Sequence, residues 1–130
     1  MNEHERGFLD FLAEPTKRRM ATLLALGEKR RPDVRALLDH SVRLHSLSCK
    51  HLTGNEADAG SVAATLRSLG APPTCFVVSA DSNLDGREML LGDALDAIVA
   101  RGNGAFVSCI PGRLGFYEYE DMRSSYLLTR

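Results

Sequence analysis

Apolar residues in the first 70 positions recur three or four apart, which is the spacing of amphipathic helices. Glycines and prolines interrupt this pattern at intervals, and Gly70 with the pair Pro72 and Pro73 ends it. The pattern predicts four or five short helices. Their apolar stripes are Phe8–Leu12, Met20–Leu24, Val34–Leu38, a weaker one at Val42–Leu52, and Val62–Leu69.

After Pro73 the pattern changes to continuous apolar runs of strand length, at 75–79 and 105–110. A polar loop and a short second strand follow the first run, and a helix opens at Asp93 and closes at Gly102. The turn Pro111–Gly112 predicts a further strand, and Arg123–Leu128 predicts the last one. The second half therefore reads β-β-α-β-β-β.

Helices followed by strands indicate the α+β class. We expect residues 1–70 to form a helical layer on one face of an antiparallel sheet of four or five strands. Residues 74–130 would supply that sheet and its one helix. We treat 1–130 as one domain, because neither half is long enough to bury a sufficient core alone.

Composition narrows the function classes. Hydrophobic residues make up 44% and charged residues 25%, which argues against disorder. The net charge of −1 predicts no strong attraction of the whole chain to nucleic acid. No apolar stretch approaches the roughly 18 residues of a membrane span, so no membrane partner is expected. The three cysteines are an odd number without a signal peptide, which predicts free thiols and a cytoplasmic location.

The loop after the first predicted strand resembles the first half of an EF-hand calcium loop. Asp81, Asn83 and Asp85 occupy alternate ligand positions, and Gly86 occupies the sharp turn. The twelfth position, which should supply a bidentate carboxylate, is Gly92. The two interpretations are a divalent-cation site and a hairpin turn in which Asp and Asn bond their own backbone.

A second group of metal-ligating residue types contains His40, His45, Cys49 and His51, of which the last three are the candidate ligands. If this segment is helical, His45 and Cys49 lie four residues apart on one face, a spacing that gives two ligands to one metal. The alternative is a set of solvated histidines near a helix end. No cofactor is predicted apart from a divalent cation at one of these two groups.

Residues 13–20, Ala-Glu-Pro-Thr-Lys-Arg-Arg-Met, with the following Leu-Leu-Ala-Leu-Gly, resemble the opening helix of ArsR-type winged-helix repressors. The resemblance implies a dimeric DNA-binding repressor, with 61–69 as the recognition helix and the 75–91 hairpin as the wing. The cationic residues Lys17, Arg18 and Arg19 would then contact phosphate.

The strand 113–119 carries its aromatic residues on both faces. Leu114 and Phe116 are expected to face the core, which leaves Tyr117 and Tyr119 on the opposite face. Two tyrosines on an open face would form an interaction platform. If a helix covers that face instead, they belong to the core.

Together these features favour a non-catalytic protein–protein interaction or regulatory module, and a homodimer is the expected assembly. Its contacts would be Tyr117, Tyr119 and the basic helix at 17–19. Two alternatives stay open. One is a winged-helix-like DNA-binding regulator. The other is a small hydrolase, metal-dependent or metal-free, that uses the carboxylates of residues 81–88, with Glu118 and Glu120 on a neighbouring strand.

Overall fold

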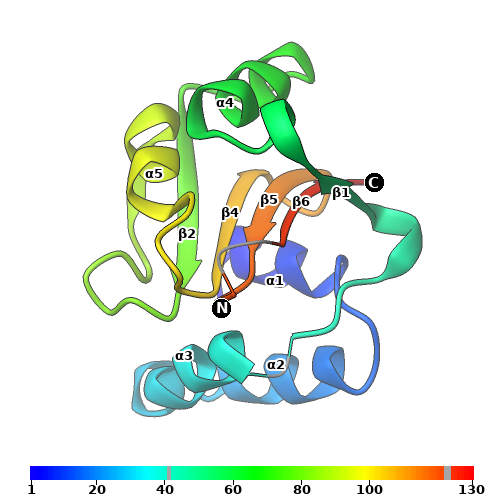
Figure 1. Ribbon diagram of the computed structural model, residues 1–130. Coiled ribbons are helices and arrows are strands. Elements are labelled where there is room, and N and C mark those ends of the chain that lie inside the picture. The colour runs from blue at the N-terminus through cyan, green and yellow to red at the C-terminus, as the bar shows by residue number, and fades with distance from the viewer. Residues whose placement is uncertain (41, 122–123) are drawn as a thin grey trace.

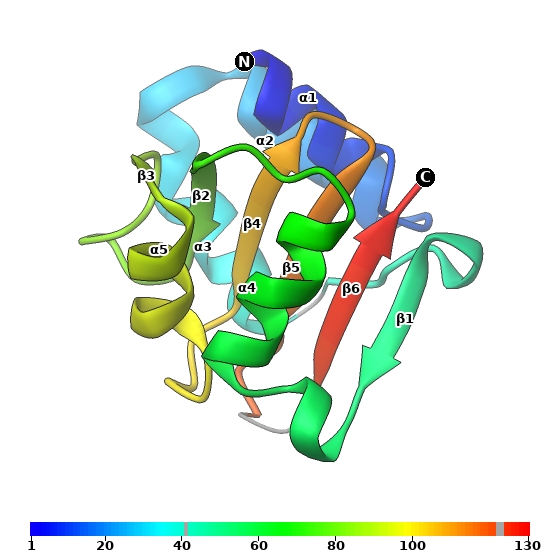
Figure 2. The same cartoon turned by 90° about the horizontal axis from the view of Figure 1, so that it is seen from above.

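The computed structural model describes residues 1–40, 42–121 and 124–130. An antiparallel sheet in the order β1-β6-β5-β4-β2-β3 runs through the molecule, and helices cover both of its faces (Figures 1 and 2). The strands are β1 (Cys49–Leu52), β2 (Thr74–Ser79), β3 (Glu88–Leu90), β4 (Ala105–Ile110), β5 (Leu114–Glu118) and β6 (Ser125–Thr129).

The helices divide into two layers. Figure 2 shows α4 and α5 in front of the sheet and the other three behind it. The rear layer holds α1 (Glu3–Leu9), α2 (Thr16–Ala25) and α3 (Arg31–His40), and the front layer holds α4 (Ala59–Ser68) and α5 (Leu91–Ile98). Short 3₁₀ turns lie at Gly27–Arg30, Ser46–Ser48 and Gly54–Glu56. Each described helix is too short or too polar to cross a bilayer.

Local signals explain where these helices begin and end. Asn2 and Glu5 form a capping box at the start of α1, with the Glu5 amide donating to Asn2 Oδ1 at 2.8 Å. Asp58 caps α4 by accepting from the Ser61 amide at 2.8 Å. Gly70 follows α4 with a φ of +101°, a conformation that glycine adopts at little cost.

Each face of the sheet has its own hydrophobic core. In β4, Phe106 points to the rear layer and Val107 to the front layer, and both are fully buried. Phe8 of α1 stacks on Phe106 with ring centroids 4.1 Å apart. Because successive side chains of a strand face opposite ways, a continuous apolar strand needs cover on both faces.

The α+β class and the antiparallel sheet are confirmed, but the arrangement differs from the prediction in two respects. The weak segment 42–52 contributes a strand, β1, which pairs with β6, whereas a helix was predicted. In addition, α4 lies on the face opposite α1–α3, whereas the prediction put all N-terminal helices on one face. The predicted last strand began at Arg123, which lies outside the described residues; the observed strand begins at Ser125.

The tyrosine face is covered. Tyr117 and Tyr119 do point away from Phe116, but α1 and α3 lie over that face of the sheet, and Tyr117 has no exposed surface. The Tyr117 hydroxyl donates to the carbonyl of Leu38 at 3.2 Å, and the Tyr119 hydroxyl donates to the carbonyl of Val42 at 3.1 Å. The open platform expected at Tyr117 is therefore replaced by a helix-covered core.

The contact between α3 and the start of β4 yields a stability prediction. A Cβ added at Gly104 would lie 2.1 Å from the carbonyl oxygen of Leu38, which is backbone and cannot rotate away. We expect Gly104→Ala to lower the free energy of unfolding by about 3 kcal/mol, measured by urea denaturation. The matched control is Gly60→Ala inside α4, where the nearest atom is 3.4 Å away. That variant should be neutral or more stable by up to about 1 kcal/mol. Equal losses in both variants would contradict the close approach.

Candidate functional site

The acidic loop between β2 and β3 is a turn stabilised by its own backbone. Asp81 Oδ1 accepts from the amide of Asn83 at 2.9 Å, as in an Asx turn. Gly86, with a φ of +76°, donates its amide to the carbonyl of Val77 at 2.8 Å. The hairpin interpretation therefore accounts for this sequence.

Asp85 is not available to a metal, because its carboxylate points inward and is already bound. It accepts from Arg31 Nε at 2.6 Å and Nη2 at 2.9 Å, and from Arg35 Nη1 at 3.4 Å. The Ser79 amide adds a further bond at 3.1 Å. Only 3% of the Asp85 side chain is exposed. The calcium interpretation of Asp81, Asn83 and Asp85 is thus replaced by an ion-pair cluster, and a hydrolase could not use Asp85 as a free carboxylate.

We call Glu5, Arg31, Arg35 and Asp85 the Arg31 cluster. Arg31 also pairs with Glu5, so its guanidinium joins α1 and α3 to the β2–β3 loop. Hydrogen bonding to Asp85 raises the pKa of Arg31 above its ordinary value against the opposing effect of burial. Two cations face two carboxylates here, so the formal charges cancel. The Arg31 cluster therefore holds α1, α3 and the β2–β3 loop together and is balanced in charge.

The second predicted metal group is not assembled. His45 lies just before a 3₁₀ turn, and its Nδ1 accepts from the Leu47 amide at 3.3 Å. Cys49 and His51 lie in β1 rather than a helix, so the predicted i, i+4 geometry with His45 is absent. His51 stacks on Tyr126 with centroids 4.9 Å apart. Across the described ranges, no three His, Cys, Asp or Glu side chains come together as a metal site.

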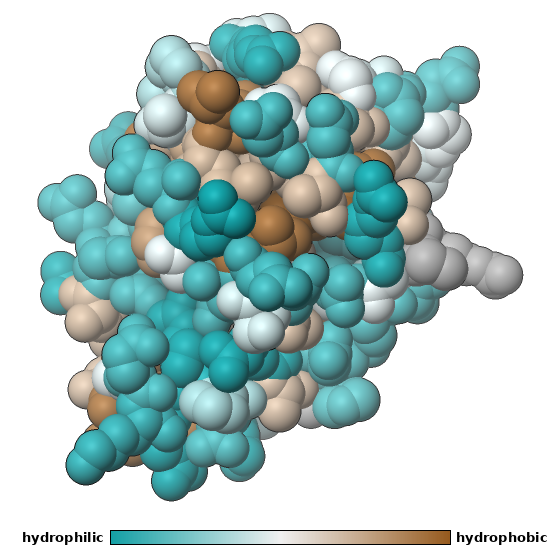
Figure 3. Space-filling view, turned by 90° about the vertical axis from the view of Figure 1, so that its left-hand side faces the viewer, coloured by the Kyte–Doolittle hydropathy of each residue, from teal (hydrophilic) through white to brown (hydrophobic). Residues whose placement is uncertain are grey.

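The basic helix lies on the outside of the rear layer. Arg18 and Arg19 are exposed and Lys17 is half-buried, all on α2. Figure 3 shows that the lower surface, where α2 and α3 lie, is largely hydrophilic. The proposed recognition helix is α4, on the far side of the sheet, and the proposed wing is part of the sheet. The described elements therefore do not form a winged-helix arrangement.

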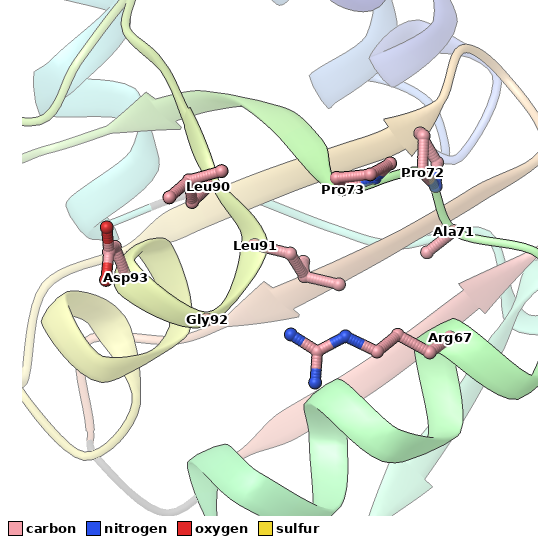
Figure 4. A pocket seen from close by; sticks show the side chains of 8 residues that line it. All are labelled: Arg67, Ala71, Pro72, Pro73, Leu90, Leu91, Gly92 and Asp93. Atoms are coloured by element: carbon pink, nitrogen blue, oxygen red, sulfur yellow. The ribbon is translucent and has the colours of Figure 1, made fainter.

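The front layer contains two hollows, one at each end of the antiparallel pair α4 and α5. The first, the Arg67 hollow, has a volume of about 390 Å³ and joins the end of α4 to the start of α5. Figure 4 shows Arg67 reaching from α4 toward Gly92, with Asp93 turned away. Arg67 Nη2 lies 3.7 Å from the position that a Cβ on Gly92 would take. Its lining residues are Arg67, Ala71, Pro72, Pro73, Leu90, Leu91, Gly92 and Asp93.

The second hollow lies at the opposite end of the same helix pair and is larger, at about 690 Å³. We call it the Glu118 hollow. It is formed by the start of α4, the end of α5, and the adjoining ends of β5 and β6. Its lining residues are Gly54, Ala57, Asp58, Ala59, Asp96, Val99, Ala100, Arg101, Glu118 and Ser125.

Glu118 is the unusual residue of this hollow. It ends β5, and it is 1% exposed although it is a carboxylate. Its Oε1 accepts from the hydroxyl of Ser125, its cross-strand neighbour, at 3.1 Å. Its Oε2 has no hydrogen-bond partner among the described residues. Buried polar atoms are nearly always hydrogen-bonded, so an exception calls for an explanation such as strain, a functional role, or a bound water, ion or ligand.

Burial raises the pKa of Glu118 above its ordinary value. The Ser125 hydroxyl and the backbone of Ala100 and Arg101 act in the opposite direction, and the nearby charge of Asp121 raises the pKa further. Desolvation outweighs the hydrogen bonds. Glu118 is therefore a carboxyl group whose charge is poorly compensated by the protein itself.

The backbone beside Glu118 is strained. Ala100 has a φ of 60°, which places it in the left-handed region that side chains other than glycine rarely adopt. This residue follows the end of α5 and lines the hollow. Strained backbone outside glycine concentrates at functional sites, where the surrounding structure holds it in place.

Sequence reasoning gave Glu118 only a minor place, as a carboxylate near a hypothetical hydrolase site. A clearer signal was present. Leu114, Phe116 and Glu118 are two residues apart in one strand, so they share a face, and the first two were expected in the core. A glutamate with the parity of core residues predicts a buried carboxylate.

Comparisons of this chain with models of protein families, with curated proteins and with solved structures find no match. The chemistry of the site is therefore the basis for a function. Of the clusters described above, the Arg31 cluster is neutral and saturated, whereas the Glu118 hollow is lined by a carboxylate with one unsatisfied, buried oxygen.

Removing the cation from the Arg31 cluster should be costly. Arg31→Met leaves Asp85 and Glu5 buried without their main partner, so we expect a loss of about 3–5 kcal/mol in the free energy of unfolding. The control is Arg30→Met, which breaks an exposed pair with Asp33 and should cost less than about 1 kcal/mol. Similar unfolding midpoints for the two variants in urea would show that the Arg31 cluster does not stabilise the fold.

Glu118 should make stability depend on pH in a definite direction. Because its pKa is raised in the folded state, its stabilising contribution is full below the unfolded-state pKa and is lost as pH rises through the folded-state pKa. Glu118→Gln removes this titration, so in urea unfolding the variant should gain stability on the wild type as the pH rises above the ordinary pKa of a glutamate. Ser125→Ala removes a hydrogen bond that lowers the pKa of Glu118, so the stability of this variant should depend more strongly on pH than that of the wild type. Parallel profiles for wild type and Glu118→Gln would contradict the raised pKa.

Proposed function

We propose that the protein is a non-catalytic regulatory module that binds a small ligand in the Glu118 hollow. One observation carries this proposal: Glu118 is 1% exposed, its Oε2 lacks a partner among the described residues, and it lines open volume. A ligand that donates a hydrogen bond to Oε2 would remove the cost of leaving that oxygen unsatisfied.

The dimensions of the hollow suit this role. Its volume of about 690 Å³ falls in the range of small-molecule sites in proteins, roughly 300–1,000 Å³. The lining combines small apolar side chains with a few polar groups, and such sites use polar groups to orient a ligand. The residues come from α4, α5, β5, β6 and the 3₁₀ turn Gly54–Glu56, so a bound ligand would bridge the helices and the sheet.

Binding of a partner protein or a second copy stays a prediction. Tyr117 is buried, so of the predicted contact residues the exposed basic ones of α2 are its main support. The cytoplasmic location is also part of the proposal. Cys49, Cys75 and Cys109 are all free thiols, and free thiols suit a reducing compartment.

Ligand binding can be tested with amide-resolved NMR and a set of small molecules that covers ammonium, guanidinium, carboxylate, phosphate, alcohol and aromatic classes. At least one class should shift the amide signals of Ala100, Arg101 and Ser125 in a saturable way at concentrations up to about 10 mM. The signals of Gly92 in the Arg67 hollow serve as the internal control and should not follow the same curve.

The Glu118→Gln variant should weaken that binding while keeping a dispersed spectrum. If no compound in the set gives saturable shifts around the Glu118 hollow, the proposed function is wrong. Shifts that survive unchanged in Glu118→Gln would mean that the ligand does not use the unsatisfied carboxylate.

A further inference from the structure

We infer that the ligand of the Glu118 hollow is a primary aliphatic amine in its ammonium form, an inference that rests on the proposed function. Glu118 Oε2 would accept a hydrogen bond from the ammonium group. The aliphatic portion would lie against the small apolar residues of the lining.

The type of hydrogen bond comes from the unsatisfied atom. In its ionised form the Glu118 carboxylate only accepts hydrogen bonds, so a ligand that binds this form has to provide a donor to Oε2. A charged donor gives a bond roughly twice as strong as a neutral one. Binding an ammonium therefore compensates both the missing hydrogen bond and the buried negative charge.

The charges around the hollow favour a cation. Asp58, Asp96 and Glu118 contribute three carboxylates against one guanidinium, that of Arg101. Arg101 is turned toward the end of α5, where its Nε and Nη2 donate to the carbonyl of Asp96 at 3.3 and 3.1 Å. The Asp58 carboxylate is occupied by Ser61 at the start of α4. Asp96 and Glu118 thus remain to attract a cation.

The number of free oxygens separates ammonium from guanidinium. A guanidinium gains most from a carboxylate when it binds both oxygens in a forked geometry. Here Oε1 of Glu118 already accepts from Ser125, which leaves one oxygen for the ligand. A single acceptor matches the compact ammonium group, and the fork of a guanidinium gains no advantage.

Two other kinds of cation fit less well. A quaternary ammonium has no N–H to donate, and its usual recognition by aromatic rings has no counterpart in the lining residues, none of which is aromatic. A hard metal ion needs several oxygen ligands at once, and no such group of three is found in the described parts of the chain. A primary amine in its ammonium form has N–H groups to donate and does not need several oxygen ligands.

The apolar part of the lining selects an aliphatic chain. Ala57, Ala59, Val99 and Ala100 supply methyl groups beside the polar groups. Each buried methylene of a ligand chain adds a favourable contribution of about 0.8 kcal/mol. An amine on a chain of a few carbons would therefore bind more tightly than the ammonium ion itself.

The experiment is an NMR titration with n-butylamine, butan-1-ol and butanoate, which share a chain and differ in the head group. The wild type should bind n-butylamine at the amides of Ala100, Arg101 and Ser125 at least about tenfold more tightly than butan-1-ol, and should not bind butanoate. Glu118→Gln should weaken amine binding by about tenfold or more.

Asp96→Asn provides a second variant, because this residue is exposed and its replacement leaves the core intact. It should weaken the amine by a few-fold and leave the alcohol unchanged. Asp93→Asn, at the other end of α5 and outside the hollow, is the matched control and should bind the amine as the wild type does. Equal weakening by both aspartate variants would indicate non-specific attraction and would overturn the inference.

The outcomes separate the two proposals. If butanol or butanoate binds as well as the amine at these amides, the amine inference fails and the proposed function stands. The same conclusion follows if n-butylamine does not bind while another compound class does. If no compound of any class binds in the hollow, both proposals fail.

Discussion

The central strands are apolar on both faces, and this requires a layer of helices on each side of the sheet. In β4 every residue from Ala105 to Cys109 is buried, so neither face can meet water. Helices α1, α2 and α3 cover one face, and α4 and α5 cover the other. Because α4 and α5 are antiparallel, each end of the pair brings a helix start next to a helix end. Both hollows of the front layer lie at those ends.

Two buried acidic groups are treated in opposite ways by this architecture. Asp85 receives guanidinium groups and a backbone amide, so its charge is compensated inside the protein. Glu118 accepts from one hydroxyl, the backbone of Ala100 and Arg101 also favours its charged form, and its Oε2 has no hydrogen-bond partner among the described residues. A buried charge with poor compensation destabilises a fold, and such groups concentrate at functional sites. This contrast distinguishes a structural carboxylate from a candidate binding carboxylate.

The fold class could be predicted because apolar periodicity reports directly on helices and strands, and the strong runs at 75–79 and 105–110 are indeed β2 and β4. The strand β1 could not, because its four residues include the exposed Lys50 and His51 and gain their structure from pairing with β6. The partner of Asp85 was equally hidden. Arg31 is 54 positions away, and only the packing of α3 against the β2–β3 loop brings the two together.

The candidate site was less predictable than the fold for the same reason. Its polar groups come from four elements, and no short motif contains two of them in a recognisable spacing. Glu118 could have been found by its parity with Phe116, since that argument is local. The lack of a partner for Oε2 could not be found in this way, because it depends on whether any neighbouring element places a hydrogen-bond donor near that atom.

The left-handed conformation of Ala100 has a consequence for how the hollow would respond to an occupant. An alanine in this region costs roughly 1–2 kcal/mol compared with an ordinary conformation, and the rest of the fold supplies that energy before any molecule arrives. Glycine would relieve the strain but would also let the loop sample many shapes. With alanine, the wall beside Glu118 has fewer backbone conformations open to it than with glycine, so an incoming molecule would lose less affinity to ordering the protein.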